Sequence, residues 1–151
     1  MRKLLGAAAL SAMLCCVLAQ KAAAQQAPPH PVFLKFSDLK WEKTSDGMQD
    51  VVILHTNPVS QATELMIRAP KNFHVPRHWH SANETLTILS GAFTMKHDGS
   101  DERVTLNPGS YSYMPAKMVH EAWAGEEGAT FFITVDGAWD LNWADERKPT
   151  Q

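Results

Sequence analysis

Cysteine is nearly missing from this sequence. The 151 residues include only Cys15 and Cys16, and both lie in one apolar run close to the N-terminus. The rest of the chain therefore has no disulfide bond to stabilise it and no thiol for catalysis. Neither cysteine follows the small residues that bacterial lipoprotein signals place before a lipidated cysteine, so we expect no lipid anchor. Stability must come from packing.

The chain also has little positive charge. It contains 14 Lys and Arg residues against 16 Asp and Glu residues, and Arg2, Lys3 and Lys21 all lie near the N-terminus. The remainder is acidic and has no basic stripe, which argues against nucleic acid or an anionic membrane surface as a partner. The sequence has no phosphate-binding glycine loop and no Ser-His-Asp order, which argues against nucleotide chemistry and acyl transfer.

The N-terminus lacks a hydrophobic run long enough for a membrane helix. After the basic start, the uncharged segment 4–19 falls short of the ~20 apolar residues that a bilayer requires, and Lys21 follows it. This pattern, ending in small residues at 22–24, is typical of a secretory signal peptide. We predict a signal peptide over 1–24, a secreted or periplasmic protein, and no membrane insertion after signal removal. An uncleaved anchor is the alternative.

The remaining residues are enough for one domain and too few for two. Prolines and the absence of apolar periodicity predict a flexible lead-in over 25–31, with the domain over 32–151. No helical periodicity competes with the short apolar or alternating runs, which turn residues separate. Many short strands predict an all-β, antiparallel sandwich or barrel of the jelly-roll kind. The predicted strands are 32–36, 51–55, 63–67, 84–89, 92–97, 104–106, 111–114, 119–123, 130–135 and 139–143.

One cluster of residues has the composition of a metal site. His78 and His80 are two residues apart, a spacing that places both imidazoles on one face of an extended chain. Glu84 follows at even spacing, so a continuing strand would present its carboxylate on the same face. His120 would add a fourth donor from a separate hairpin. Three nitrogens and one carboxylate suit a first-row divalent metal and leave one or two coordination positions open.

These residues resemble the two motifs of the cupin superfamily. His78, His80, Glu84 and Gly91 have the spacing of the first motif; Gly109, Pro115 and His120 have that of the second. The resemblance implies a jelly-roll (double-stranded β-helix) cupin barrel with these three histidines and Glu84 as metal ligands. Three positions depart from the family pattern: Asn72 and Lys117 replace glycines, and Ala124 replaces an asparagine. Asn72 tolerates a left-handed backbone, whereas Lys117 leaves the turn before His120 open to question.

Other side chains are weaker candidates. His74 could line the mouth of the site, although an exposed loop position is the stronger expectation. Glu121 should face away from His120, so we do not expect it to act as a general base. The aromatic residues expected in the core or at a subunit contact are Trp79, Trp123, Phe131, Phe132, Trp139 and Trp143. The predicted pocket walls are Leu86, Ile88, Phe93, Met114 and Met118.

The function that this pattern favours is a small-molecule metalloenzyme of dioxygenase type, with isomerase or lyase chemistry also open. The alternative is a non-catalytic module in which the metal holds a small ligand or stabilises the barrel. Zinc, manganese, iron, nickel or copper could fill the site; export without a twin-arginine signal favours zinc or copper over ferrous iron. We expect a small organic ligand and a homodimer formed through an edge strand.

Overall fold

The computed structural model describes residues 30–44 and 47–145. The predicted signal peptide (1–24) and most of the predicted lead-in lie outside these residues. Residues from Leu34 onward form one unit. Within the described residues no helix has the length and hydropathy needed to span a membrane.

Antiparallel strands make up this unit, and the part of the chain that the structure describes contains no α-helix. A single 3-10 turn, η1 (Phe36–Asp38), precedes the strands. The strands are β1 (Glu42–Lys43), β2 (Asp50–Thr56), β3 (Thr63–Ala69), β4 (His74–Trp79), β5 (Glu84–His97), β6 (Val104–Leu106), β7 (Tyr111–Met114), β8 (His120–Val135) and β9 (Asn142–Trp143).

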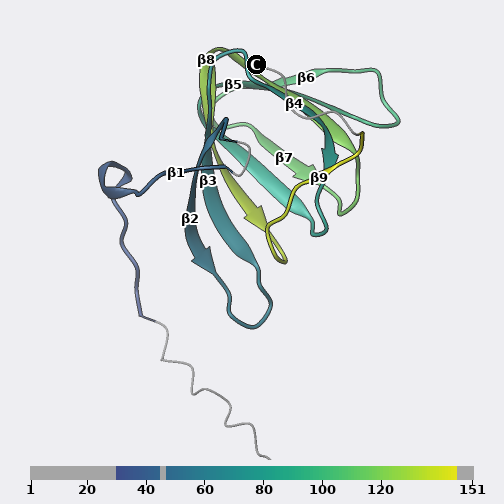
Figure 1. The fold of residues 1–151 in the computed structure, drawn as a ribbon. Coiled ribbons are helices and arrows are strands. Elements are labelled where there is room, and N and C mark those ends of the chain that lie inside the picture. The colour runs from purple at the N-terminus through teal and green to yellow at the C-terminus, as the bar shows by residue number, and fades with distance from the viewer. Residues whose placement is uncertain (1–29, 45–46, 146–151) are drawn as a thin grey trace, which may run out of the picture. The chain divides into compact units, whose positions relative to one another are not determined.

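The long strand β8 joins the parts of the sheet. One path runs in the order β1-β2-β3-β8-β4-β9, and β5 pairs with β6, β7 and β8. β8 thus pairs with β3 along its second half, with β4 along its first half, and with β5 along most of its length. Figure 1 shows the strands curling around a common interior. The prediction of an all-β jelly-roll fold is confirmed.

Two continuous, bent strands replace two pairs of predicted strands. We predicted separate strands at 84–89 and 92–97, and again at 119–123 and 130–135, but each pair is one continuous strand. The β5–β8 register shifts between Ile88 and Ser90 and between Gly91 and Phe93. Gly91 has a φ of 74°, and a Cβ there would lie 2.0 Å from the carbonyl oxygen of Gly128. Glycine therefore lets the backbones approach and bend without ending the strand.

The other strand errors are two wrong predictions and two missed strands, of which β1 has only two residues. Residues 32–36 form no strand, because these exposed apolar residues have no neighbouring strand to pair with. β4 was missed, since Pro76 and polar residues obscure its alternation. The predicted strand 139–143 shrinks to β9, whose two residues pair with the end of β4.

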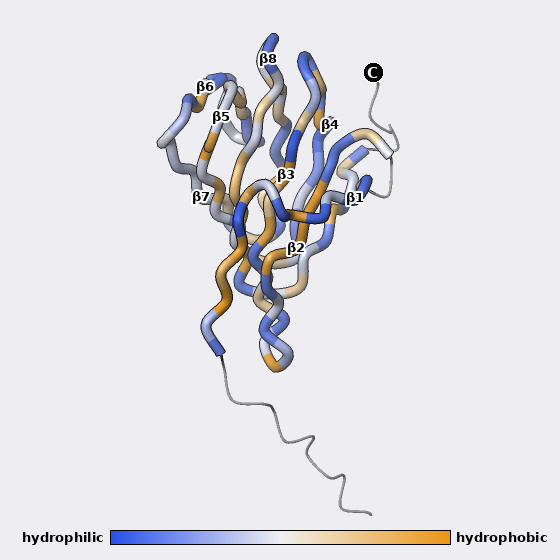
Figure 2. The backbone as a smooth tube through the Cα atoms, turned by 90° about the vertical axis from the view of Figure 1, so that its left-hand side faces the viewer, coloured by the Kyte–Doolittle hydropathy of each residue, from blue (hydrophilic) through white to orange (hydrophobic). Residues whose placement is uncertain are grey.

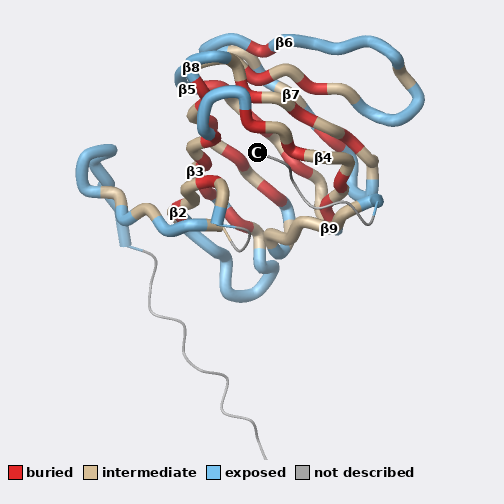
Figure 3. Tube along the Cα trace, turned by 45° about the horizontal axis from the view of Figure 1, so that its top comes forward, coloured by how far each residue is buried: buried red, intermediate tan, exposed pale blue. Residues whose placement is uncertain are grey.

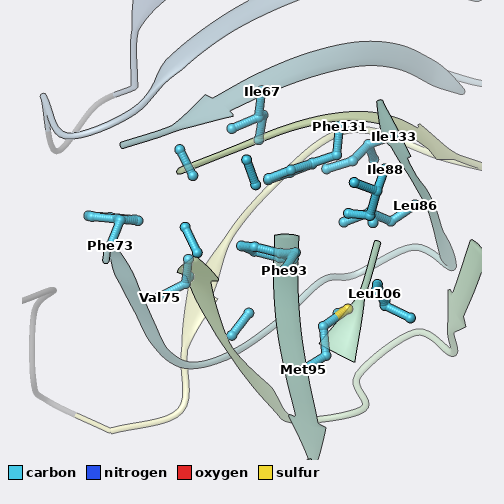
Figure 4. Close-up of a cluster of buried hydrophobic side chains, with 14 of the residues drawn as sticks. Ile67, Phe73, Val75, Leu86, Ile88, Phe93, Met95, Leu106, Phe131 and Ile133 are labelled. Atoms are coloured by element: carbon cyan, nitrogen blue, oxygen red, sulfur yellow. The ribbon is translucent and has the colours of Figure 1, made fainter. Parts of the chain in front are cut away.

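The core lies between the curled strands. Burial alternates along β3 and along both halves of β8, as expected for strands with one face inward. Hydrophobic and hydrophilic stretches interleave along the strands in Figure 2, and buried residues follow the strands in Figure 3. Phe93 of β5 and Phe131 of β8 contact each other with ring centroids 4.6 Å apart (Figure 4). This apolar interior also surrounds the candidate site.

Candidate metal centre

Three histidines converge inside the barrel. His78 lies in β4, His80 directly follows that strand, and His120 begins β8. A ring nitrogen from each lies within 4.8 Å of the others. Their exposed fractions are 5%, 3% and 2%. The β4–β8 pairing brings them together, because His78 and His120 are direct partners in its register.

Glu84 joins the histidines by a different route from the one we predicted. The chain leaves β4 at Trp79 and turns, so Glu84 is the first residue of β5 instead of a continuation of the His78 strand. Its two carboxylate oxygens lie 3.6 Å from His80 Nε2 and 3.7 Å from His120 Nε2. Glu84 is only 4% exposed. All four predicted ligand residues are therefore near neighbours, and their role as ligands stays a prediction.

Curvature of the β5–β8 pair explains this meeting. Glu84 at the start of β5 pairs with Val135 at the end of β8, while His120 at the start of β8 pairs with His97 at the end of β5. The two residues thus stand at opposite ends of one antiparallel ladder. Their side chains meet because the ladder curls back on itself through the glycine bend at Gly91.

Backbone carbonyls orient all three imidazoles. His78 Nδ1 lies 2.7 Å from the Pro76 carbonyl oxygen, and His120 Nδ1 lies 3.0 Å from that of Met118. His80 Nδ1 makes a short contact with the carbonyl oxygen of Asp140. A carbonyl only accepts, so each Nδ1 carries a proton and donates it. Each neutral ring therefore keeps its lone pair on Nε2, the arrangement that a metal-binding histidine requires.

Burial controls the protonation of the centre. Desolvation lowers the pKa of His120 to about 4, and it lowers the pKa of His78 well below its ordinary value, with the neighbouring imidazoles adding to the effect. Desolvation also raises the pKa of the Glu84 carboxyl, against a smaller opposing effect of His80. His78 and His120 are therefore held neutral at neutral pH, which is the protonation state that binds metal.

The two residues that replace family glycines both adopt positive φ. Asn72 has a φ of 55° and Lys117 a φ of 64°. The backbone N–H of Lys117 donates to the carbonyl oxygen of His80 at 2.8 Å, so the turn before His120 also fixes His80. Lys117 therefore keeps the turn geometry that we had left open.

An apolar cavity of about 770 Å³ opens from the centre. Leu86 and Phe93 line it as predicted, whereas Ile88, Met114 and Met118 do not. Phe131 lies in the core as expected, Trp139 and Trp143 pack against the core, and all three also line the cavity. Trp139 stacks on His80 at a centroid distance of 4.8 Å. A cavity of this size and polarity suits a small organic ligand.

The remaining histidine candidate lies elsewhere. His74 belongs to β4, and its Nε2 lies 2.7 Å from Glu121 Oε1. Its ring stacks on Trp123 at 5.1 Å, and neither residue lines the cavity. Both expectations for His74, the mouth of the site and an exposed loop, were wrong. Glu121 faces away from the centre, as predicted.

Sequence reasoning missed the side of the cavity that residues around β1 and β2 supply. Thr44, Met48 and Gln49 line the cavity, yet they precede the first histidine ligand candidate by about thirty positions. No periodicity or motif links them to it. Gln49 is nevertheless 5% exposed, which is unusual for its residue type.

Comparison with known proteins agrees with this geometry. A family model described as the ChrR cupin-like domain matches residues 29–138, which is more than half of the chain. The chain belongs to this cupin family. The predicted cupin barrel is thereby confirmed.

Two curated relatives match part of this cupin. It is 32% identical over 79 residues to the DNA damage-repair/toleration protein DRT102 of Arabidopsis thaliana, covering 52% of this chain and 25% of that protein. It is 32% identical over 78 residues to quercetin 2,3-dioxygenase of Bacillus subtilis (strain 168), covering 51% of this chain and 23% of that protein. The matched segment thus spans about a quarter of either relative.

A solved structure extends the likeness to the whole barrel. An acetylacetone dioxygenase from Acinetobacter johnsonii aligns with a TM-score of 0.62 at 17% identity, covering 79% of this chain and 81% of that one. At this identity, the likeness establishes the shared fold alone.

Proposed function

We propose that this protein is an exported, metal-binding cupin that acts as a small metalloenzyme on an organic substrate, with dioxygenase-type oxidation as its reaction. The observation that carries the proposal is the convergence of three buried imidazoles and one buried carboxylate at an apolar cavity. Apolar side chains at these positions would stabilise the fold better, because buried ionisable groups cost stability. The set therefore indicates a functional role.

The donor set fits a first-row divalent metal. The Nε2 atoms of His78, His80 and His120 and a carboxylate oxygen of Glu84 would hold the ion. Four protein donors leave one or two positions open on a five- or six-coordinate ion. When bound, the metal supplies a Lewis acid or a redox centre beside the substrate. Zinc, manganese, iron, nickel and copper all accept this set.

The residues of the chain prepare the cavity for such chemistry. Apolar walls such as Leu86, Phe93 and Phe131 exclude water and bury the body of the substrate. Trp139, stacked on His80, offers a flat face at the centre. In the metal-free protein burial raises the pKa of the Glu84 carboxyl, whereas beside a bound metal the same group would serve as an ionised carboxylate donor.

The names of two compared proteins agree with oxidation as the reaction. One partial relative is a quercetin dioxygenase, and one protein of the same fold is an acetylacetone dioxygenase. Lyase or isomerase chemistry remains the alternative for the same ligand set.

Oxygen consumption tests the reaction. The protein, loaded in turn with iron, manganese, nickel, copper and zinc, is mixed with flavonols and β-diketones in an oxygen electrode. We expect oxygen uptake with at least one redox-active metal, and its loss in the His78→Ala/His120→Ala variant. The exposed His55→Ala variant is the matched control and should keep the activity. Stoichiometric metal without turnover of any compound would instead favour a non-catalytic binding module.

Export rests on the pattern of residues 1–24. Cell fractionation and N-terminal sequencing of the natural protein should find a mature chain outside the cytoplasm that begins near Gln25. Recovery of the uncleaved chain from the cytoplasm would contradict this part of the proposal.

A further inference from the structure

Gln49 is an unexplained polar residue in the wall of the cavity. It directly precedes β2, lines the cavity and is 5% exposed. Its side-chain Oε1 is buried and has no hydrogen-bond partner. Within the described residues one other buried side-chain atom shares this condition, Arg68 Nε, and Arg68 does not line the cavity. Buried amide oxygens almost always accept a hydrogen bond, so this one requires an explanation.

The backbone holds Gln49 firmly in this position. Its N–H donates to Thr44 Oγ1 at 3.1 Å, and its carbonyl oxygen accepts from the N–H of Thr44 at 2.9 Å. The adjacent residues Lys43 and Asp50 pair in the β1–β2 register, and their side chains form an ion pair at 2.9 Å. Gln49 therefore lies in the cavity wall on a backbone that is hydrogen-bonded to Thr44, as a preorganised binding group would be.

The polar side chain of Gln49 contrasts with those of two apolar neighbours. Met48 and Val51, close to it in sequence, also line the cavity and are apolar. An apolar side chain at position 49 would continue this wall without leaving a polar atom unpaired. The presence of an amide here indicates a polar group on the molecule that the cavity receives.

We propose that Gln49 positions the substrate, its amide oxygen accepting a hydrogen bond from a neutral hydroxyl group. The inference rests on the proposed small-molecule function and narrows the substrate class to an apolar or aromatic body that carries an alcohol or phenol. A neutral hydroxyl suits a cavity wall that is mostly apolar and that already contains the cation Lys43. The two carboxylates in the described wall are Glu84, a candidate metal ligand, and Asp140, which accepts a hydrogen bond from the N–H of Ser81.

The test measures the affinity of ligands with and without a hydroxyl group for the wild-type protein and two variants. The probes are 4-hydroxyacetophenone against acetophenone, and quercetin against flavone, titrated by quenching of tryptophan fluorescence. The wild-type protein should bind each hydroxylated probe roughly tenfold more tightly than its partner, and Gln49→Met should remove most of this preference. The affinity for acetophenone should stay unchanged. Leu141→Met, which alters the same wall without removing an acceptor, should keep the preference.

Equal affinity for both members of each pair in the wild type, or no binding of any probe, would overturn the inference. So would an equal weakening of both members by Gln49→Met. Thermal unfolding of the ligand-free protein gives an independent measurement: Gln49→Met should raise Tm, because it removes an unpaired buried oxygen. A lower Tm would assign Gln49 a structural role and contradict the proposal.

Metal analysis of the same samples separates this inference from the proposed function. Hydroxyl selection by a protein that holds no metal would sustain the role of Gln49 while refuting the metalloenzyme. Bound metal without hydroxyl selection would refute only the role of Gln49.

Discussion

At the scale of single residues, the buried Glu84 carboxylate lowers the free energy of unfolding of the metal-free protein. Burial raises its pKa, so ionised Glu84 costs folding free energy as the pH rises above 4.5 and through the folded-state pKa. Glu84→Gln should therefore stabilise the metal-free protein at pH 7, by about 1–3 kcal/mol, and weaken metal binding. Chemical denaturation after chelation measures the first effect and metal titration the second. A less stable metal-free variant would contradict this account.

The imidazoles of His78 and His120 have the opposite pH dependence: they lower the stability of the metal-free protein as the pH falls. The pKa of His120 falls from 6.5 to about 4 in the folded protein, and that of His78 falls well below 6.5. The unfolded chain therefore binds more protons between these values, and the metal-free protein loses stability as the pH falls from about 6.5 toward 4.

We expect His120→Asn to reduce this acid-induced loss by up to about 3 kcal/mol, the equivalent of its pKa shift. Urea unfolding at several pH values checks this. The proteins compared are Glu84→Gln with and without His120→Asn, so that the carboxyl contribution is absent from both. An unchanged pH dependence in His120→Asn would show that His120 does not carry the effect.

The meeting of the four candidate ligands in space could be predicted from sequence because the spacing within each motif is specific. The other residues of the cavity wall could not be predicted in this way. Trp139 and Gln49 reach the cavity only through the path of β9 and the β1–β2 pairing, which no short motif encodes. The route of Glu84 was also wrong, since even spacing predicts a shared face only while a strand continues past His80.

At the scale of elements, the bend in β5 is the feature that closes the centre. Gly91 adopts a φ of 74°, and a Cβ there would meet the carbonyl oxygen of Gly128 at 2.0 Å. Gly91→Ala must displace backbone, so it should destabilise the protein by about 3 kcal/mol or more and weaken metal binding. Denaturant unfolding and metal titration measure these effects.

Gly99→Ala is the matched control for this bend. Gly99 has a φ of 91°, but a Cβ there would meet nothing within 4 Å. It should therefore cost only about 1 kcal/mol from the backbone conformation and leave metal binding unchanged. Equal effects of the two substitutions would argue against a role for the close β5–β8 approach.

The sequence predicts which segments form strands better than it predicts where each strand ends. Short apolar runs predict β3, β6 and β7 well, because all three strands end at ordinary turns and β3 also buries one face. The glycine signals in β5 and β8 predict turns just as well as bends, and only the pairing partner decides between them. The apolar run 32–36 failed for the same reason, since its composition specifies a strand but no partner.

At the scale of the whole molecule, the metal should stabilise the fold. The candidate ligands come from β4, from the residue after it, from β5 and from β8, so an ion would link segments that are distant in sequence. Removing the metal with a chelator should lower Tm, in line with about 2.7 kcal/mol at a free metal concentration of 100 times Kd. Differential scanning calorimetry checks this, with the His78→Ala/His120→Ala variant as the chelator-insensitive control. An unchanged Tm in the wild type would argue against a linking ion.

The expected homodimer and the secreted or periplasmic location are also properties of the whole molecule, and both stay predictions. The exposed apolar side chains of Phe33 and Phe36 are of the kind that oligomer contacts cover. Analytical ultracentrifugation of the mature protein would establish its state.

The most direct test of the metal centre is elemental analysis of the protein recovered from its natural compartment. The wild type and His55→Ala should carry close to one transition metal per chain, and the His78→Ala/His120→Ala variant should carry none while remaining folded. Metal-free wild-type protein, or equal metal in the double variant, would contradict the assignment of this cluster as a metal centre.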